Sequence, residues 1–153
     1  MPPIFNKTLI TMDLSKILSI SGKSGLFKLV SQGKNNFIVE SFEDQKRFPA
    51  FQSDGISTLD NISIYTHDDM LELKKVFQSV YIKQDKQPLE YKTWSDTQIR
   101  DFFKEVIPNY DEERVFVSNI KKIYQWYNIL LNNDLISIDE PVEATEPEPN
   151  EEQ

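Results

Sequence analysis

Three residues of an early loop, Gly22-Lys23-Ser24, have the composition of the end of a phosphate-binding loop. Such a loop follows a parallel strand and wraps a phosphate with the backbone amides of several glycines. The positions upstream, 17–19, hold Ile, Leu and Ser instead, and the whole chain has only four glycines. The fragment therefore predicts an ordinary turn, and a dinucleotide-binding glycine motif is excluded.

A lone histidine stands beside two acids in His67-Asp68-Asp69, a combination that metal sites and acid–base catalysts use. Adjacent residues rarely converge on one ion, and a position between a predicted strand and a predicted helix favours a role in capping that helix. The chain has no cysteine and no second histidine, which excludes disulfides, cysteine-ligated metals and multi-histidine centres. We expect no metal and no cofactor.

Catalytic groups are equally sparse. The acids of Asp111-Glu112-Glu113, next to Arg114, could begin a pair of catalytic carboxylates, but no second carboxylate is placed opposite them, so they predict a solvated turn. The serines have His67 as their one candidate base and lack a nucleophile-elbow sequence. These residues predict a protein that is not an enzyme.

Binding is better supported, first by the helix predicted near the C-terminal end. On a helical wheel, one stripe holds six apolar or aromatic residues: Ile120, Ile123, Tyr124, Tyr127, Leu130 and Leu131. Trp126 and Ile129 lie outside that stripe, beside Lys122. Two alternatives stay open: a helix that packs on two sides, or an exposed aromatic and basic patch that contacts a partner.

A second group of basic and aromatic residues is Lys46-Arg47-Phe48 with Phe51. Such residues hold single-stranded nucleic acid by stacking and phosphate contact, although with so few basic residues a protein partner fits at least as well. The candidate binding residues are Lys46, Arg47, Phe48, Phe51, Lys122, Trp126 and Ile129.

Strands must position the residues of the first half. After a leader over 1–11, Asp13 and the apolar residues up to Leu18 predict one or two turns of amphipathic helix. Strands are predicted over 26–31, 37–42, 47–51 and 62–66, with Pro49 at a sheet edge because it cannot donate to a ladder. Short strands and tight turns predict a small SH3-like β-barrel or an open bent sheet.

Helices dominate the second half. Apolar residues at spacings of three and four predict helices over 70–80, from Ser95 to the residue before Pro108, and over 118–132, with a polar linker at 84–93. Ser95 and Gln98 have the form of a capping box. The predicted class is therefore α+β. It has a small β domain at 12–66 and a helical domain at 67–138, which we expect to be separable.

Charge is concentrated at the C-terminal end. The 153 residues carry a net charge of −8, yet seven acids and no base fall within 139–153, and the rest has 17 basic and 18 acidic residues. This composition predicts a disordered acidic tail on a nearly neutral body. No export signal and no apolar run of membrane-spanning length is present, so we expect a cytoplasmic protein without membrane contact.

Several strings along the chain are similar to one family. They are MDLSKILSISGK from Met12, GLFKLVSQ from Gly25, KRFPAF from Lys46, ISIYT from Ile62, IPNYD from Ile107, RVFVS from Arg114 and IKKIYQWY from Ile120. Over about Met12 to Leu131 the chain resembles a small uncharacterised family of Bacteroidota, a domain of unknown function. The resemblance implies a bacterial cytoplasmic protein with a β module and a helical module, and it transfers no catalytic or binding residue.

These observations together favour a non-enzymatic interaction or adaptor protein whose partner is another protein. The alternative is an RNA- or ribosome-associated factor, because SH3-like barrels and helical pairs are common scaffolds for such proteins.

Overall fold

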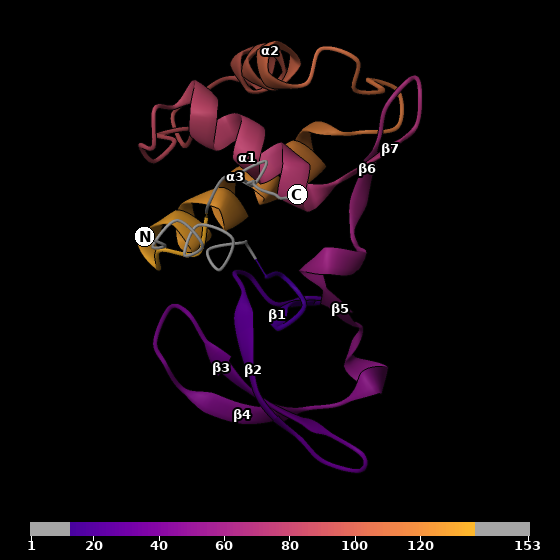
Figure 1. Cartoon of the computed structure of the whole chain (residues 1–153), viewed down its shortest axis with the longest axis vertical. Coiled ribbons are helices and arrows are strands. Elements are labelled where there is room, and N and C mark those ends of the chain that lie inside the picture. The colour runs from indigo at the N-terminus through magenta and orange to yellow at the C-terminus, as the bar shows by residue number, and fades with distance from the viewer. Residues whose placement is uncertain (1–12, 137–153) are drawn as a thin grey trace, which may run out of the picture.

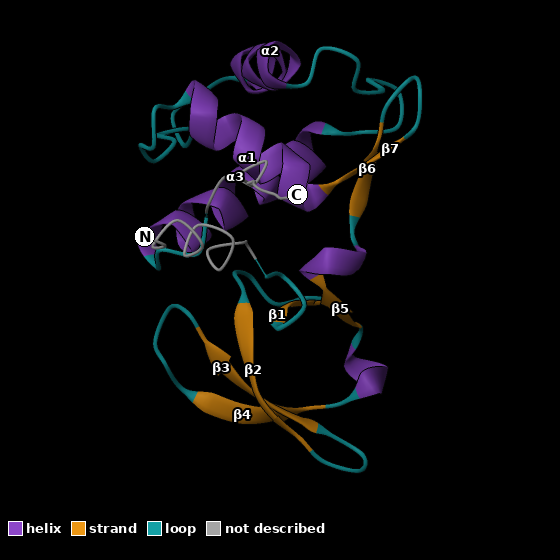
Figure 2. Cartoon of the chain, in the orientation of Figure 1, coloured by secondary structure: helices purple, strands orange, loops and turns teal. Residues whose placement is uncertain are grey.

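The computed structural model describes residues 13–136, in which all strands precede the three α-helices (Figures 1 and 2). The strands are β1 (Ile17–Ile20), β2 (Phe27–Gln32), β3 (Phe37–Ser41), β4 (Arg47–Ala50), β5 (Ile56–Thr58), β6 (Ser63–Tyr65) and β7 (Met70–Glu72). The helices are α1 (Leu73–Lys83), α2 (Asp96–Val106) and α3 (Val117–Asn132), with short 3-10 turns η2 (Gln52–Asp54) and η3 (Leu59–Asn61). The predicted α+β class is confirmed. The predicted leader and acidic tail lie outside the described residues.

The first five strands form an open antiparallel sheet in the order β4-β3-β2-β1-β5. Within residues 13–136 the two edge strands, β4 and β5, do not pair with each other, so the sheet does not close. The SH3-like barrel is therefore wrong, and the open sheet is the alternative that holds. Pro49 lies in edge strand β4, as predicted.

The amphipathic helix predicted over 13–18 is also wrong, because this segment is a turn leading into β1. Asp13 accepts hydrogen bonds from the backbone N–H and the hydroxyl of Ser15, at 3.0 and 2.6 Å. Ile17 then packs toward the helices, whereas Leu18 and Ile20 face a second cluster on the other side of the sheet. A strand buried on both faces has a continuous apolar run, which a helical periodicity can imitate.

Residues 63–72 form a hairpin: the strand predicted at 62–66 is confirmed as β6, but 70–72, predicted as the start of a helix, forms its partner β7. In the pairing of β6 with β7, Ile64 lies opposite Leu71. His67-Asp68-Asp69 is the tip of this hairpin: the Thr66 hydroxyl accepts from the N–H groups of Asp68 (3.2 Å) and Asp69 (2.9 Å). The predicted capping role is thus corrected, because α1 begins only at Leu73 and Glu72 is its N-cap.

The other two helices agree with their predictions. Ser95 and Gln98 form the predicted capping box, with Gln98 Oε1 accepting from the Ser95 N–H at 2.8 Å and Ser95 Oγ accepting from the Gln98 N–H at 3.2 Å. Helix α3 begins one residue before its predicted start and ends at the predicted Asn132.

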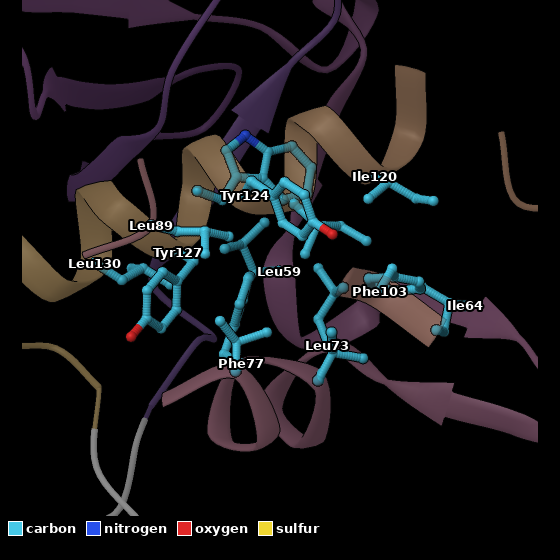
Figure 3. Close-up of a cluster of buried hydrophobic side chains, with 14 of the residues drawn as sticks. Leu59, Ile64, Leu73, Phe77, Leu89, Phe103, Ile120, Tyr124, Tyr127 and Leu130 are labelled. Carbon is cyan, nitrogen blue, oxygen red and sulfur yellow. The ribbon is translucent and has the colours of Figure 1, made fainter. Parts of the chain in front are cut away.

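One large hydrophobic core joins both halves of the chain (Figure 3). Leu14, Ile17, Leu26 and Leu59, from the first half, belong to the same cluster as the buried residues of the three helices. The predicted linker is also tied to this core. Leu89 is only 2% exposed, and its N–H and C=O groups both bond the Asn128 side chain at 2.8 Å.

Two buried tyrosines of this core differ in one hydrogen bond. The Tyr124 hydroxyl donates to the Ile99 carbonyl at 2.7 Å, and burial raises the pKa of Tyr124. The Tyr110 hydroxyl is buried without a hydrogen-bond partner among the described residues. An unsatisfied buried hydroxyl costs about 1–3 kcal/mol, whereas a made hydrogen bond contributes about 1 kcal/mol net.

We expect Tyr110→Phe to leave the free energy of unfolding unchanged or to raise it, because the variant removes an unpaired polar atom. Tyr124→Phe, the matched control, should lower it by about 1 kcal/mol. Urea unfolding of both variants measures the difference. Equal losses in the two variants would show that the Tyr110 hydroxyl is satisfied in solution.

Candidate functional site

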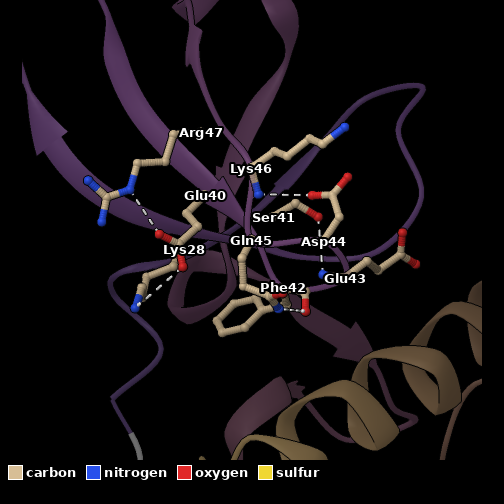
Figure 4. A network of polar contacts seen from close by, with 9 residues as sticks. All are labelled: Lys28, Glu40, Ser41, Phe42, Glu43, Asp44, Gln45, Lys46 and Arg47. Carbon is tan, nitrogen blue, oxygen red and sulfur yellow. Dashed lines mark hydrogen bonds and ion pairs between the residues drawn. The ribbon is translucent and has the colours of Figure 1, made fainter.

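The predicted group at residues 46–51 runs from Lys46, just before β4, to Phe51, just after it, and its basic residues lie in a network of mixed charge (Figure 4). Arg47 Nε is 2.9 Å from Glu40 Oε1, and Lys28 Nζ is 4.0 Å from Glu40 Oε2. The backbone N–H of Lys46 donates to Asp44. Because carboxylates alternate with the cations, this surface does not present the positive stripe that a phosphate backbone requires.

The aromatic members of that group take two different positions. Phe48 is half-buried, packed edge-on against Phe27 with ring centroids 5.6 Å apart, and the Lys23 ammonium lies 5.3 Å from the Phe48 ring centroid. Phe51 is 43% exposed. Lys23 belongs to the predicted turn, which is confirmed: its N–H bonds the Ile20 carbonyl at 3.0 Å, between the antiparallel strands β1 and β2.

On α3, the exposed aromatic patch is not formed. Trp126 is 7% exposed and belongs to the large core, Ile129 is half-buried against that core, and only Lys122 is exposed. The physical reason is that α3 has neighbours on two sides. Besides the helices, it contacts the loop between β1 and β2, where Gln125 Nε2 donates to Ser24 Oγ at 3.0 Å. Packing on two sides is therefore the alternative that holds.

A mostly apolar groove of about 210 Å³ lies between β6 and the N-terminal half of α3. One wall is the continuous stretch 62–65. Leu73, the first residue of α1 after the hairpin, also lines the groove. The opposite wall is made by Arg114, Val115, Asn119, Lys122, Ile123 and Trp126. None of the described residues that line the groove is an acid.

The β6 side of the groove is an open strand edge. Ile62 and Thr66 bond the β7 side of the hairpin, through Leu73 N–H to Ile62 O (3.2 Å) and Thr66 N–H to Asp69 O (3.0 Å). Because backbone groups alternate in direction along an antiparallel strand, the N–H and C=O groups of Ser63 and Tyr65 point away from β7.

A short segment, 109–111, begins to cover that edge and then leaves it. The Asp111 N–H donates to the Tyr65 carbonyl and the His67 N–H to the Asn109 carbonyl, both at 2.9 Å. The Asp111 carbonyl then accepts from the N–H groups of Arg114 and Val115, so the chain turns away. Within the described chain, the Ser63 N–H and C=O and the Tyr65 N–H have no hydrogen-bond partner.

Arg114 is held at the end of the groove where this turn lies. Its Nε donates to Asp111 Oδ2 at 2.8 Å, and its guanidinium carbon lies 4.2 Å from the centroid of the Tyr65 ring. Tyr65 is 41% exposed. The hydrogen bond from Arg114 holds the pKa of Asp111 below its ordinary value. The predicted turn at 111–113 is confirmed, with Glu112 and Glu113 exposed, but Asp111 is buried and not solvated.

The lowered pKa of Asp111 predicts how stability depends on pH. A carboxyl group whose pKa is lower in the folded chain stabilises it above the unfolded pKa, about 3.9, and loses this contribution as the pH falls through the folded value. We therefore expect Asp111→Asn to be less stable than the native chain at neutral pH, with a difference that shrinks below about pH 4. Urea unfolding at several pH values measures it. A difference that is constant with pH would show that the carboxylate charge contributes nothing.

The lone histidine and its neighbouring acids do not form a metal site among the residues that the structure describes. His67 is exposed at the hairpin tip, and the Asp68 carboxylate next to it accepts from Asn109 Nδ2 at 2.7 Å. Between residues 13 and 136 no three His, Cys, Asp or Glu side chains are grouped as metal ligands. No helix in the same range is long and apolar enough to cross a bilayer.

Sequence reasoning missed Ser63, Tyr65 and Asn119 as site residues, and treated Arg114 only as part of a turn. One signal for them existed. In Ile62–Thr66 the alternation places Ser63 and Tyr65 on the same side of the strand, and an aromatic residue on a polar face is a common mark of a contact surface.

Comparisons with known proteins place the chain in a family. Two models of domains of unknown function match it, DUF5606 over residues 14–59 and DUF6852 over residues 62–130. A solution NMR structure of a Bacteroides vulgatus protein is 39% identical, with a TM-score of 0.68; the match covers 88% of this chain and 99% of that one. The comparison with curated proteins found no match. The chain therefore belongs to the family of the Bacteroides vulgatus protein, with DUF5606 in its N-terminal part and DUF6852 in its C-terminal part.

Proposed function

We propose that this chain is a non-enzymatic protein-binding module that takes up an extended segment of a partner protein along the open edge of β6. The observation that carries the proposal is a set of three backbone groups on this edge that lack a partner among the described residues, the N–H and C=O of Ser63 and the N–H of Tyr65, beside an apolar groove. Strand addition uses these two elements together: backbone hydrogen bonds supply affinity and the groove accepts side chains.

Two properties of the surface favour a protein over RNA. The groove has two cationic side chains, Arg114 and Lys122, and is otherwise lined by neutral residues, most of them apolar. Nucleic-acid affinity depends on several phosphate contacts, each of which adds to a steep loss of affinity with salt. The other basic group, around Arg47, is neutralised in part by Glu40.

The test removes one edge donor without disturbing the hairpin. Ser63→Pro deletes the N–H that points into the groove, and proline is tolerated where a strand N–H faces outward. Ile62 has φ −103° and ψ 134°, a conformation suited to the residue before a proline. Ser63→Ala is the matched control, because it removes the hydroxyl and keeps the N–H.

The probe is a synthetic peptide, taken as the dominant sequence from a displayed library of random dodecapeptides selected on the full chain. We expect Ser63→Ala to bind it like the native chain and Ser63→Pro to bind at least about tenfold more weakly, with unchanged melting temperatures. Equal affinity for both variants would contradict strand addition. Failure of the selection, together with strongly salt-dependent binding of a single-stranded oligouridylate, would favour the RNA alternative.

A further inference from the structure

We infer that the bound segment carries a carboxylate next to a large apolar side chain, and that Arg114 and Lys122 select this carboxylate. The inference rests on the proposed function, because it concerns the occupant of the same groove. It adds the chemistry of the partner to the place where the partner binds.

The first argument is that Arg114 is held in place with donors to spare. A guanidinium has five N–H donors, and Asp111 takes the one on Nε at 2.8 Å. Its guanidinium carbon also lies over the Tyr65 ring, 4.2 Å from the ring centroid, which restricts the movement of the group. The terminal Nη groups have no partner among the described residues. A guanidinium held in this way loses little entropy when it bonds a carboxylate in bidentate geometry.

The second argument concerns Lys122, which lies in α3 and lines the same wall of the groove as Arg114. Its neighbour Lys121 faces away from the groove and pairs with Asp96 at 3.7 Å. Lys122 makes no ion pair with any residue between 13 and 136. The groove therefore holds two cations, and the one acid between residues 13 and 136 that touches either of them, Asp111, lies outside its lining. A segment that balances the charge of these two cations must therefore carry a negative group.

The third argument is the size and lining of the groove. Its apolar lining includes Ile64, Leu73, Ile123 and Trp126, and its volume is about 210 Å³. An apolar cavity of about 150 Å³ accommodates benzene. The groove can therefore accept one side chain of the size of Leu or Phe while the carboxylate stays at the rim.

The chain's own acidic end matches only half of this description. Residues 139–153 contain seven acids, but apart from three prolines Val142 is their one apolar side chain larger than alanine. This segment could satisfy the cations and would leave the apolar part of the groove unfilled. A segment of another protein that combines both properties is the better occupant.

The experiment measures the selected peptide and its Glu/Asp→Gln/Asn analogue against four variants of the full chain. Arg114→Gln and Lys122→Gln remove the two groove cations. Arg47→Gln and Lys121→Gln are the matched controls, since they remove an arginine and a lysine that lie outside the groove. Melting temperatures of all four variants verify that they fold.

We expect the selected peptides to place an acid within two positions of a large apolar residue. Arg114→Gln should weaken binding about tenfold and Lys122→Gln by a smaller factor, with both controls unchanged. The amide analogue should bind the native chain and Arg114→Gln equally, because the interaction of the two charges is then already lost.

Three results would overturn the inference. In the first, Ser63→Pro weakens binding, but the acidic peptide and its amide analogue bind equally well to the native chain and to both groove variants. The proposed function would then stand, and recognition of a carboxylate would be refuted. A gain of about tenfold in affinity on truncation after Ile138 would make the chain's own tail the occupant. Concentration-dependent dimerisation that Ser63→Pro abolishes would make a second copy the occupant. Indifference of binding to Ser63→Pro, in contrast, would refute the proposed function itself.

Discussion

Trp126→Ala is expected to lower the free energy of unfolding by about 3–5 kcal/mol, the usual cost of deleting a buried aromatic side chain. The indole is 7% exposed and lies in the core that both halves of the chain share. It also lines the groove, so its loss should weaken peptide binding as well. Urea unfolding of the single variant measures the stability change.

The control for this substitution is Ile82→Ala on α1, since Ile82 is 63% exposed. Surface substitutions usually change stability by less than about 0.5 kcal/mol. A loss below about 1 kcal/mol for Trp126→Ala would mean that the indole is exposed in solution and would restore the surface patch on α3.

Leu59→Ala should destabilise the whole chain by about 2–5 kcal/mol. Leu59 lies in η3, between the sheet and the hairpin of β6 and β7, and is fully buried in the cluster that contains Leu26 and Phe77. Because one core spans both halves, we expect the native chain and the variant each to unfold in a single transition, at a lower temperature in the variant.

Calorimetry and the temperature dependence of NMR signals from β3 and α2 test this expectation. The signals of both elements should disappear together. Two separate transitions, of which Leu59→Ala shifts only one, would contradict a shared core and support the separable β and helical domains predicted from the sequence.

The elements that sequence reasoning predicted well are those with one buried face and a local boundary signal. Helix α2 has a wide apolar stripe and the Ser95 capping box, and β2 and β3 are joined by a polar turn. A segment with two buried faces and two of the three-residue strands were not recognised. β1 imitates a helix because both of its faces are covered. β5 and β7 have three residues each and were missed, whereas the equally short β6 was predicted as part of the alternating stretch 62–66.

The groove could not be predicted from local patterns, because it joins residues far apart in the chain. Ser63 and Tyr65 come from a hairpin, Arg114 from a turn, and Lys122 from a helix. Trp126 was assigned to a possible surface because a helical wheel assumes a single neighbour, whereas α3 packs against elements on two sides. Only Lys122, among the predicted binding residues, is an exposed residue that lines the groove.

Hydrogen exchange of the Ser63 and Tyr65 amides, with and without the selected peptide, tests most directly whether a segment pairs with β6. Both N–H groups are unpaired in the described chain, so they should exchange quickly in the free protein. Peptide binding should slow both amides, whereas the Ser57 amide in β5 should be unaffected. Binding of the peptide without any protection of Ser63 and Tyr65 would contradict strand addition at this edge.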